Sequence, residues 1–436
     1  MNRREFLKGS MAVAGATATC GAWAEGEVGD PSAPLIASAP MLQNPAPTSM
    51  GVAFAVSAMA NGFVEYSESP DLSGAKKVKC GGFRVTDMND KVMLVRLTGL
   101  KPATKYHYRI GADRISYKGG YKMKILGTET DPRIHSFTTA GENAEAHFCV
   151  CNDTHVQWSS FGLVIDKIAE LKPGLVVWNG DATNTEESID HQISVFLNPE
   201  IARKDYAAEI PYCLVPGNHD QRGLANRHLE RVVMFRQPEE RSSRDWDLGR
   251  NFAFRLGDIA LVGLDTGEDK PDRRDVFAGL FNNEPYRVAQ TEWLRDALER
   301  PDIKSAPYVV AFCHIPLYDS REWANPGGIC DNGGGKYKHG FALWEKSCAE
   351  MWGPLFEKAG VQVLIAAHEH CYRYDAPAAG HSWAQIVGGG PTFNEKEGKF
   401  QTVIDGRVEG CALKIAVHDV HRSRVVGEFS YKPRNV

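Results

Sequence analysis

The chain has 436 residues, of which 43% are hydrophobic and 24% are charged, and its formal net charge is −5. This length suits two large domains or three smaller ones, and the composition is that of a soluble globular protein. The negative net charge argues against a protein that binds nucleic acid duplexes by neutralising phosphates, because that mode of binding needs a basic surface. A small phosphate ester held by metal ions is not excluded.

Residues 1–24 carry the features of an export signal in the expected order. An Arg-Arg pair precedes an apolar stretch of small residues, 11–19, and an Ala-x-Ala cleavage motif ends at Ala24. The apolar stretch is shorter than the roughly 20 residues that span a bilayer. We therefore expect twin-arginine-type export to the periplasm or the extracellular space, with no transmembrane segment in the mature chain. Lipid attachment through Cys20 is the less favoured alternative, because the preceding residues fit a lipobox poorly.

The next part of the chain is predicted to be a linker followed by short strands. Residues 25–34 are predicted to be the linker, and the Pro-, Ala- and Ser-rich composition of 30–47 extends it into the first domain. Apolar residues alternate weakly through 51–66, and further strands are predicted at 92–97 and 106–110. This pattern of short strands indicates an all-β domain.

The stretch from Leu100 to Tyr106, Leu-Lys-Pro-Ala-Thr-Lys-Tyr, resembles the Leu-x-Pro-x-Thr-x-Tyr signature of fibronectin type III domains. The resemblance covers residues 35–140 and implies a β-sandwich in which Tyr106 ties a strand to the preceding loop. Thr138-Thr139 would close the last strand. Because this stretch has no cluster of catalytic residue types, we expect it to act as a scaffold or to position substrate.

A short polar linker at 141–146 leads into a second domain, 147–436, in which strands alternate with helical patterns. The helices are predicted at 161–171, 286–298 and 351–359, and three late strands at 384–387, 413–417 and 425–429. In the second helix the side chains expected to face inward are Val288, Trp293, Leu294 and Leu298. The third helix is expected to break at Gly353-Pro354.

Two long segments lack a regular pattern. Residues 265–283 are polar and charged, whereas 318–346 are rich in glycine and aromatic residues. Loops of this length are uncommon unless they serve a function. The aromatic residues favour a substrate-facing flap at 318–346, with a plain surface insertion as the alternative. Cys330 and Cys348 flank its glycine-rich part and could form a disulfide in an oxidising compartment.

Five apolar runs are predicted to be strands, at 147–151, 175–178, 212–215, 308–313 and 361–367, and each ends in residue types that bind metal ions. The groups that follow them are Asn152-Asp153-Thr154-His155, Asn179-Gly180-Asp181, Gly217-Asn218-His219-Asp220, His314 and His368-Glu369-His370. Ligands gathered at the carboxyl ends of strands form the sites of α/β proteins, so these groups are predicted to converge. Carboxylate, amide and imidazole ligands suit Mn, Fe, Zn or similar ions.

In order and placement, these five loops resemble the signature of the calcineurin-like metallophosphoesterases: Asp-x-His, Gly-Asp, Gly-Asn-His-Asp/Glu, His and Gly-His-x-His. The one departure is Ala367 in place of the last glycine. The resemblance implies a four-layer α/β/β/α domain after the all-β sandwich, so a fold of mixed α+β and α/β class. It also implies two metal ions, divalent or trivalent. One would be held by Asp153, His155, Asp181 and His370, and the other by Asp181, Asn218, His314 and His368. Asp181 would bridge them because a carboxylate has two oxygens to share.

The same resemblance implies a hydrolase that cleaves phosphoric ester bonds by attack of a metal-bridging hydroxide. His219 would bind no metal and would assist the leaving oxygen, with Asp220 holding its tautomer. Asn184 and Arg222 are further candidates for substrate binding. Paired fibronectin-like and phosphoesterase domains are similar to purple acid phosphatases. That branch, however, has tyrosine at position 184 and glycine at position 155, so no tyrosinate ligand is expected here.

Several alternatives stay open at this point. The substrate is expected to be a small phosphate ester rather than a nucleic acid duplex, but monoesters and diesters fit equally well. The sequence does not indicate the metals or the oligomeric state. The main rival is a fibronectin-type binding or adhesion module beside a non-catalytic phosphoesterase-like domain, and a sulfatase-like or lipid hydrolase is a third possibility. The complete ligand set argues against a domain that has lost catalysis.

Overall fold

The computed structural model describes residues 32–81, 88–201, 205–235, 246–317, 341–378 and 381–434. The predicted export signal with Cys20, most of the 25–34 linker, Cys330 and residues 318–340 of the predicted flap lie outside these ranges. Cys348 is buried, and its pairing with Cys330 stays a prediction. In the described ranges, no helix combines the length and the apolar character needed to cross a membrane.

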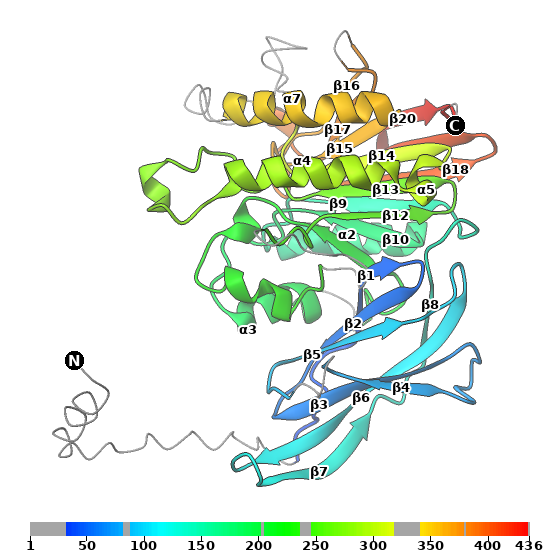
Figure 1. Cartoon of the computed structure of the whole chain (residues 1–436), viewed down its shortest axis with the longest axis vertical. Coiled ribbons are helices and arrows are strands. Elements are labelled where there is room, and N and C mark those ends of the chain that lie inside the picture. The colour runs from blue at the N-terminus through cyan, green and yellow to red at the C-terminus, as the bar shows by residue number, and fades with distance from the viewer. Residues whose placement is uncertain are drawn as a thin grey trace, which may run out of the picture.

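Two large sheets pack face to face at the centre of the molecule (Figure 1). Within the described residues the first sheet has nine strands, in the order β20 (Arg424–Tyr431), β19 (Ala412–Asp419), β18 (Thr402–Glu409), β9 (His147–Cys151), β10 (Leu175–Asn179), β11 (Tyr212–Val215), β1 (Met41–Ala46), β2 (Ser49–Ala55) and β5 (Val92–Thr98). The second has six, in the order β12 (Phe252–Leu256), β13 (Ile259–Leu264), β14 (Tyr308–Cys313), β15 (Val363–Ala366), β17 (Ala384–Val387) and β16 (Arg373–Asp375).

Helices cover the outer faces of both sheets. Helix α2 (Trp158–Leu171) packs on the first sheet, and α4 (Asn283–Glu299) and α7 (Phe341–Ala359) lie together on the second. The central strands are buried on both faces and are therefore mostly apolar, with His147 in β9 and Asn179 in β10 as polar exceptions. This is the four-layer α/β/β/α arrangement that the resemblance implied. The shorter helical elements are α3 (Ile189–Gln192), η1 (Ile193–Leu197), η2 (His219–Gln221), η3 (Asn226–Arg231), η4 (Asp275–Phe277), α5 (Pro301–Lys304) and η5 (Glu395–Glu397).

The N-terminal domain is a β-sandwich. Strands β1, β2 and β5 form one side, and the other has the order β4 (Lys76–Lys79), β3 (Ala60–Ser67), β6 (Lys105–Tyr117) and β7 (Met123–Thr130), with β8 (His135–Thr138) also pairing with β6. The Tyr106 hydroxyl accepts a hydrogen bond from the Lys101 backbone N–H at 3.0 Å, which confirms the predicted corner. The fibronectin type III character and the boundary at 140 stay predictions.

The first sheet continues from the catalytic domain into the sandwich. Strand β1 pairs in parallel with β11 through Gln43 and Tyr212, and the Leu42 N–H donates to the Ala207 carbonyl at 2.9 Å. The prediction that residues 30–47 form a linker was therefore wrong over β1. The buried Gln43 amide donates to the Val232 carbonyl at 3.1 Å. Its polar side chain is thus satisfied by a distant part of the chain, which composition could not indicate.

Two helix predictions need correction. Helix α7 begins at Phe341 and runs through Pro354 without a break. Trp352 and Phe356 are fully buried on either side of Pro354, and this burial offsets the roughly 3 kcal/mol that an interior proline costs. In α4, Leu294 and Leu298 face inward as predicted, but Val288 is 56% exposed. The adjacent Arg287 is buried instead, because its guanidinium donates to backbone carbonyls beneath the helix.

Candidate metal centre

The five strand-end loops meet at one rim between the two sheets. Strands β9, β10 and β11 are parallel neighbours in the first sheet, as are β14 and β15 in the second, so their carboxyl ends lie at the same edge. The buried Asn179 side chain joins the two sheets just below this edge. Its amide nitrogen donates to the carbonyls of Cys313 at 3.0 Å and Ile365 at 3.1 Å. The strand ends are therefore fixed relative to one another.

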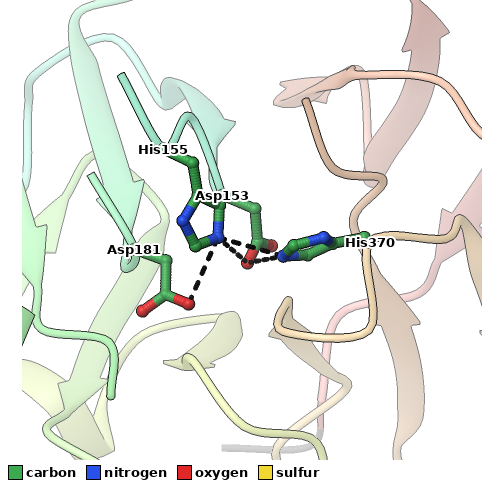
Figure 2. A group of neighbouring side chains, drawn as sticks. All are labelled: Asp153, His155, Asp181 and His370. Carbon is green, nitrogen blue, oxygen red and sulfur yellow. Dashed lines mark hydrogen bonds and ion pairs between the residues drawn. The ribbon is translucent and has the colours of Figure 1, made fainter. Parts of the chain in front are cut away.

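One group of side chains at this rim comprises Asp153, His155, Asp181 and His370, whose ligand-type atoms all lie within 4.8 Å of one another. Figure 2 shows the four side chains pointing toward a common centre. The Nε2 atoms of His155 and His370 are 3.0 Å apart. Asp153 Oδ1 lies 3.3 Å from His370 Nε2, and Asp181 Oδ2 lies 3.5 Å from His155 Nε2.

A second group shares Asp181 with the first. It comprises Asp181, His314 and His368, again with ligand-type atoms within 4.8 Å. His314 Nε2 lies 3.2 Å from Asp181 Oδ2. Asn218 Oδ1 lies 3.0 Å from His368 Nδ1, so the amide oxygen joins this group. The seven side chains predicted to bind metal are thus brought together in two adjoining groups.

Hydrogen bonds behind the groups set which atoms face the centre. His155 Nδ1 lies 3.0 Å from Asn184 Oδ1, and His314 Nδ1 lies 2.9 Å from the Asn179 carbonyl. An oxygen that can only accept keeps the proton on Nδ1, so Nε2 of each ring presents a lone pair. Asp153 Oδ2 accepts from the Asn152 amide and the His368 backbone N–H. Among the described residues its Oδ1 and His314 Nε2 are buried without a well-aligned hydrogen bond, and each faces only ligand-type atoms of the two groups.

Asp181 reaches both groups through a single oxygen. Its Oδ1 accepts the backbone N–H of His219 at 2.9 Å, which leaves Oδ2 between His155 and His314. The backbone amide of the neighbouring loop uses one of the lone pairs of Oδ1. That Asp181 shares both oxygens between two ions stays a prediction.

The loops hold these side chains on strained backbone. Twelve described residues other than glycine have left-handed φ, and five of them belong to the two groups: Asp153 (45°), His155 (46°), Asp181 (51°), His368 (69°) and His370 (58°). Such conformations persist only where surrounding contacts impose them, and they cluster at functional sites. Ala367, at the position of the family's glycine, is not in this region of φ, so the substitution costs no strain.

Two glycines allow the loops to approach so closely. A Cβ at Gly217 would lie 2.2 Å from Asp181 Oδ1. A Cβ at Gly180 would lie 2.3 Å from His314 Nδ1, and its φ of +83° is in any case unfavourable for other residues. Larger residues at either position would push the two groups apart.

The electrostatics of the centre favour bound cations. Burial by itself would lower the pKa of His314, yet the carboxylates of Asp181 and Asp153 raise it to about 10. Burial would likewise raise the pKa of Asp153, but the adjacent His370 and His155 hold it well below its usual range. Two buried carboxylates thus draw positive charge into the centre. Carboxylate, amide and imidazole donors whose buried ligand-type atoms face one another fit metal ions.

His219 lies at the edge of the two groups, with its side chain 30% exposed and Nε2 4.0 Å from Asp181 Oδ2. Its Nδ1 lies 2.8 Å from the Asn184 carbonyl, which holds the proton there. Its Nε2 lies 3.3 Å from Arg222 Nη1. Burial, together with the Arg222 guanidinium, lowers the pKa of His219.

Asp220 does not contact the His219 ring, so the prediction that it holds the tautomer was wrong. Its carboxylate accepts the backbone N–H groups of Gly217 and Asp181 at 2.9 Å and of Thr183 at 3.3 Å. Consecutive side chains of a helical turn point in different directions, and η2 turns Asp220 inward. Asp220 therefore joins the β10 and β11 loops. The Asn184 carbonyl, rather than Asp220, holds the tautomer of His219.

Asn184 is exposed, and its side chain is engaged by His155. Its side-chain oxygen faces His155 Nδ1, and its amide donates to the His155 carbonyl at 3.2 Å. Its contact with substrate stays a prediction. Arg222 is paired with Glu268, a residue that sequence reasoning missed. The only signal for Glu268 was the charged character of the 265–283 loop.

The fold and the two groups together define an α/β/β/α domain with metal-type ligands at its strand ends. The model of the calcineurin-like phosphoesterase family matches residues 146–372 of this chain. That match covers more than half of the chain. The chain belongs to the calcineurin-like phosphoesterase family.

Individual relatives have low sequence identity to this chain. Mouse (Mus musculus) acid phosphatase type 7 is 25% identical over 285 residues, which cover 64% of this chain and 55% of that protein. Probable purple acid phosphatase 20 of Arabidopsis thaliana is 22% identical over 300 residues, 66% of this chain and 56% of that protein. The chain therefore spans about half the length of the curated relatives it matches.

Solved structures confirm the fold. Purple acid phosphatase PPD1 from yellow lupin (Lupinus luteus) seeds aligns with a TM-score of 0.61 at 14% identity, over 90% of this chain and 74% of that one. PhoD aligns with a TM-score of 0.59 at 12% identity, over 92% of both chains. Both alignments extend beyond the residues of the family match, and so include most of the N-terminal domain.

Proposed function

We propose that this protein is a metal-dependent hydrolase of phosphoric esters with two metal ions at the strand-end rim. One observation carries the proposal: Asp181 Oδ2 lies between two groups of inward-facing imidazoles, beside buried atoms of Asp153 and His314 that face only other ligand-type atoms. One ion would be held by Asp153, His155, Asp181 and His370, and the other by Asp181, Asn218, His314 and His368. Asp181 would be shared by both ions.

Two bound ions would supply an activated water and neutralise charge at phosphorus. The protein's part is to hold the ester beside them and to assist departure of the alcohol. His219 is suited to the second task because its Nε2 faces the shared carboxylate and its Nδ1 is fixed by the Asn184 carbonyl. Asp220 contributes by fixing the backbone of the Gly217 and Asp181 loops.

Phosphate monoesters are the favoured substrate class. The support comes from the names of the relatives, acid phosphatase and purple acid phosphatase. The relatives do not indicate which ions are used, because Asn184 stands where the purple acid phosphatases have their tyrosine.

The test is to reconstitute the purified protein separately with Mn, Fe and Zn and to assay a panel of phosphate monoesters and diesters. We expect about two metal ions per chain by elemental analysis and faster hydrolysis of monoesters. Binding of a single ion would contradict the shared-carboxylate centre. Two bound ions without hydrolysis of any ester would instead favour a non-catalytic phosphoesterase-like domain.

We also propose export through the Arg3-Arg4 signal, which rests on sequence alone. Replacing both arginines by lysine should leave the protein in the cytoplasm of a bacterial host, as measured by cell fractionation. A protein that is exported equally well after this change would not use the twin-arginine route.

A further inference from the structure

Glu268 is a buried acid that is connected to the candidate metal centre through Arg222 and His219. It follows β13, and its side chain is fully buried. Both of its oxygens are engaged by Arg222, which donates from Nε at 2.9 Å and from Nη2 at 2.7 Å. A paired contact of this kind fixes the plane of the guanidinium as well as its position. Lys270 Nζ, at 3.7 Å, is the other cation near this carboxylate.

The backbone that carries Glu268 is itself braced by helix α4. The buried Arg287 guanidinium donates to the Thr266 carbonyl at 2.9 Å and to the Glu268 carbonyl at 2.5 Å. The Gln290 amide donates to the Asp265 carbonyl at 2.7 Å. The start of the 265–283 loop is therefore a fixed support.

Arg222 extends from this support to His219. Its third nitrogen, Nη1, lies 3.3 Å from His219 Nε2, and its side chain is 28% exposed. His219 Nε2 in turn lies 4.0 Å from the shared Asp181 Oδ2. One edge of the Arg222 guanidinium is thus held by the buried Glu268 carboxylate. The other edge is directed toward the two groups of ligand-type side chains, where a phosphate ester would bind.

We propose that Glu268 is a positioning residue that holds Arg222 over His219, so that the edge of the guanidinium that faces away from Glu268 and carries Nη1 binds the phosphoryl group of the substrate. The inference rests on the proposed function. An arginine is a good partner for phosphate oxygens because its N–H groups form a planar fork. A flexible arginine would have to be ordered on binding, whereas Glu268 orders it beforehand.

The alternative is that Glu268 and Arg222 form a buried ion pair that only stabilises the fold. In the proposal Glu268 affects phosphate binding through Arg222, whereas in the alternative it affects only stability. The experiment compares wild type, Glu268→Gln, Arg222→Ala and the double variant, each loaded with the ions that support activity. The measurements are kcat and KM on a phosphate monoester and the affinity for inorganic phosphate by calorimetry. Asp131→Asn is the matched control, because Asp131 is also buried and accepts a paired contact from Arg133 in the distant sandwich.

We expect Glu268→Gln to weaken phosphate binding and raise KM by about tenfold, the scale of one charge-assisted hydrogen bond. Its effect on kcat should be smaller. In the Arg222→Ala background the same change should have no further effect on phosphate affinity, because Glu268 acts only through Arg222. Asp131→Asn should lower thermal stability without changing phosphate affinity.

Two results would overturn the inference: an equal loss of affinity from Glu268→Gln with and without Arg222, or wild-type affinity in a folded Glu268→Gln variant. If Glu268→Gln does not fold, Arg222→Lys tests the same geometry, since lysine lacks the fork. Wild-type phosphate affinity in Arg222→Lys would then overturn the inference. Failure of the proposed function can be told apart from failure of this inference, because in that case the wild-type protein with two bound ions hydrolyses no ester.

Discussion

Two buried clusters in this protein contain the same kinds of side chain but differ in how their charges are satisfied. In the centre at the strand ends, Asp153 Oδ1 and His314 Nε2 make no well-aligned hydrogen bond, and each faces another ligand-type atom, His370 Nε2 at 3.3 Å and Asp181 Oδ2 at 3.2 Å. The inner cluster, which consists of His147, Cys149 and Asp405, also has ligand-type atoms within 4.8 Å of one another. There, however, Asp405 Oδ1 lies 2.7 Å from His147 Nε2, and Oδ2 accepts from Arg407 at 2.5 Å.

The backbone explains the difference. His147 and Cys149 lie on β9, opposite Arg407 and Asp405 on β18 in regular antiparallel register. Regular pairing places side chains side by side, where a cation and an anion can neutralise each other. Asp153 follows the same strand β9, but on left-handed backbone beyond its end. Most of the ligand-type residues of the centre lie on such loops, so residue types alone do not distinguish a metal centre from an ion pair.

The sharpest test of this comparison is Asp181→Asn. It should remove metal from both positions and lower activity by about 10⁴-fold or more, because the bridging charge is lost. Metal content by elemental analysis and turnover on a monoester are the measurements. A variant that still holds two ions tightly would show that Asp181 is not the bridge.

His219→Gln should separate chemistry from metal binding. We expect kcat to fall by about 10²- to 10³-fold, the usual contribution of a positioned acid or base, with metal content nearly unchanged. Parallel loss of metal and activity would instead place His219 among the ligands.

Asp405→Asn tests the inner cluster. It should leave two ions and nearly normal turnover in place, while lowering the free energy of unfolding by about 3 kcal/mol, because His147 and Arg407 lose their buried partner. Denaturant unfolding together with elemental analysis provides the measurement. Loss of a metal ion from this variant would erase the distinction between the two clusters.

Glu186 shows a third way to satisfy a buried acid, since its Oε2 has no partner in the described structure and no histidine faces it. Burial, and then the nearby Asp220, raise the pKa of Glu186 to about 7. A raised folded-state pKa gives stability that is full below the unfolded value and is lost as pH rises through about 7. Wild type should therefore lose about 2 kcal/mol more stability than Glu186→Gln between pH 5 and pH 8. Equal pH profiles in denaturant unfolding would show that Glu186 is already ionised.

Sequence patterns located the strands that end at the rim. His147–Cys151 and Tyr308–Cys313 were predicted with the bounds that the structure has, because strands buried on both faces are continuous apolar runs. The order of the loops after them predicted that Asp153, Asp181 and His314 would meet. Their roles as ligands stay proposals.

Contacts between segments far apart in the sequence determine the features that the sequence patterns did not predict. That Asp220 bonds backbone amides, that Asp181 Oδ1 accepts the His219 N–H and that Glu268 holds Arg222 all depend on groups about 40 residues away in the chain. Strand β1 likewise joined the first sheet by pairing with β11, through Gln43 and Tyr212. A local pattern specifies which polar atoms a segment carries, but only the packed structure specifies which partner each buried atom meets.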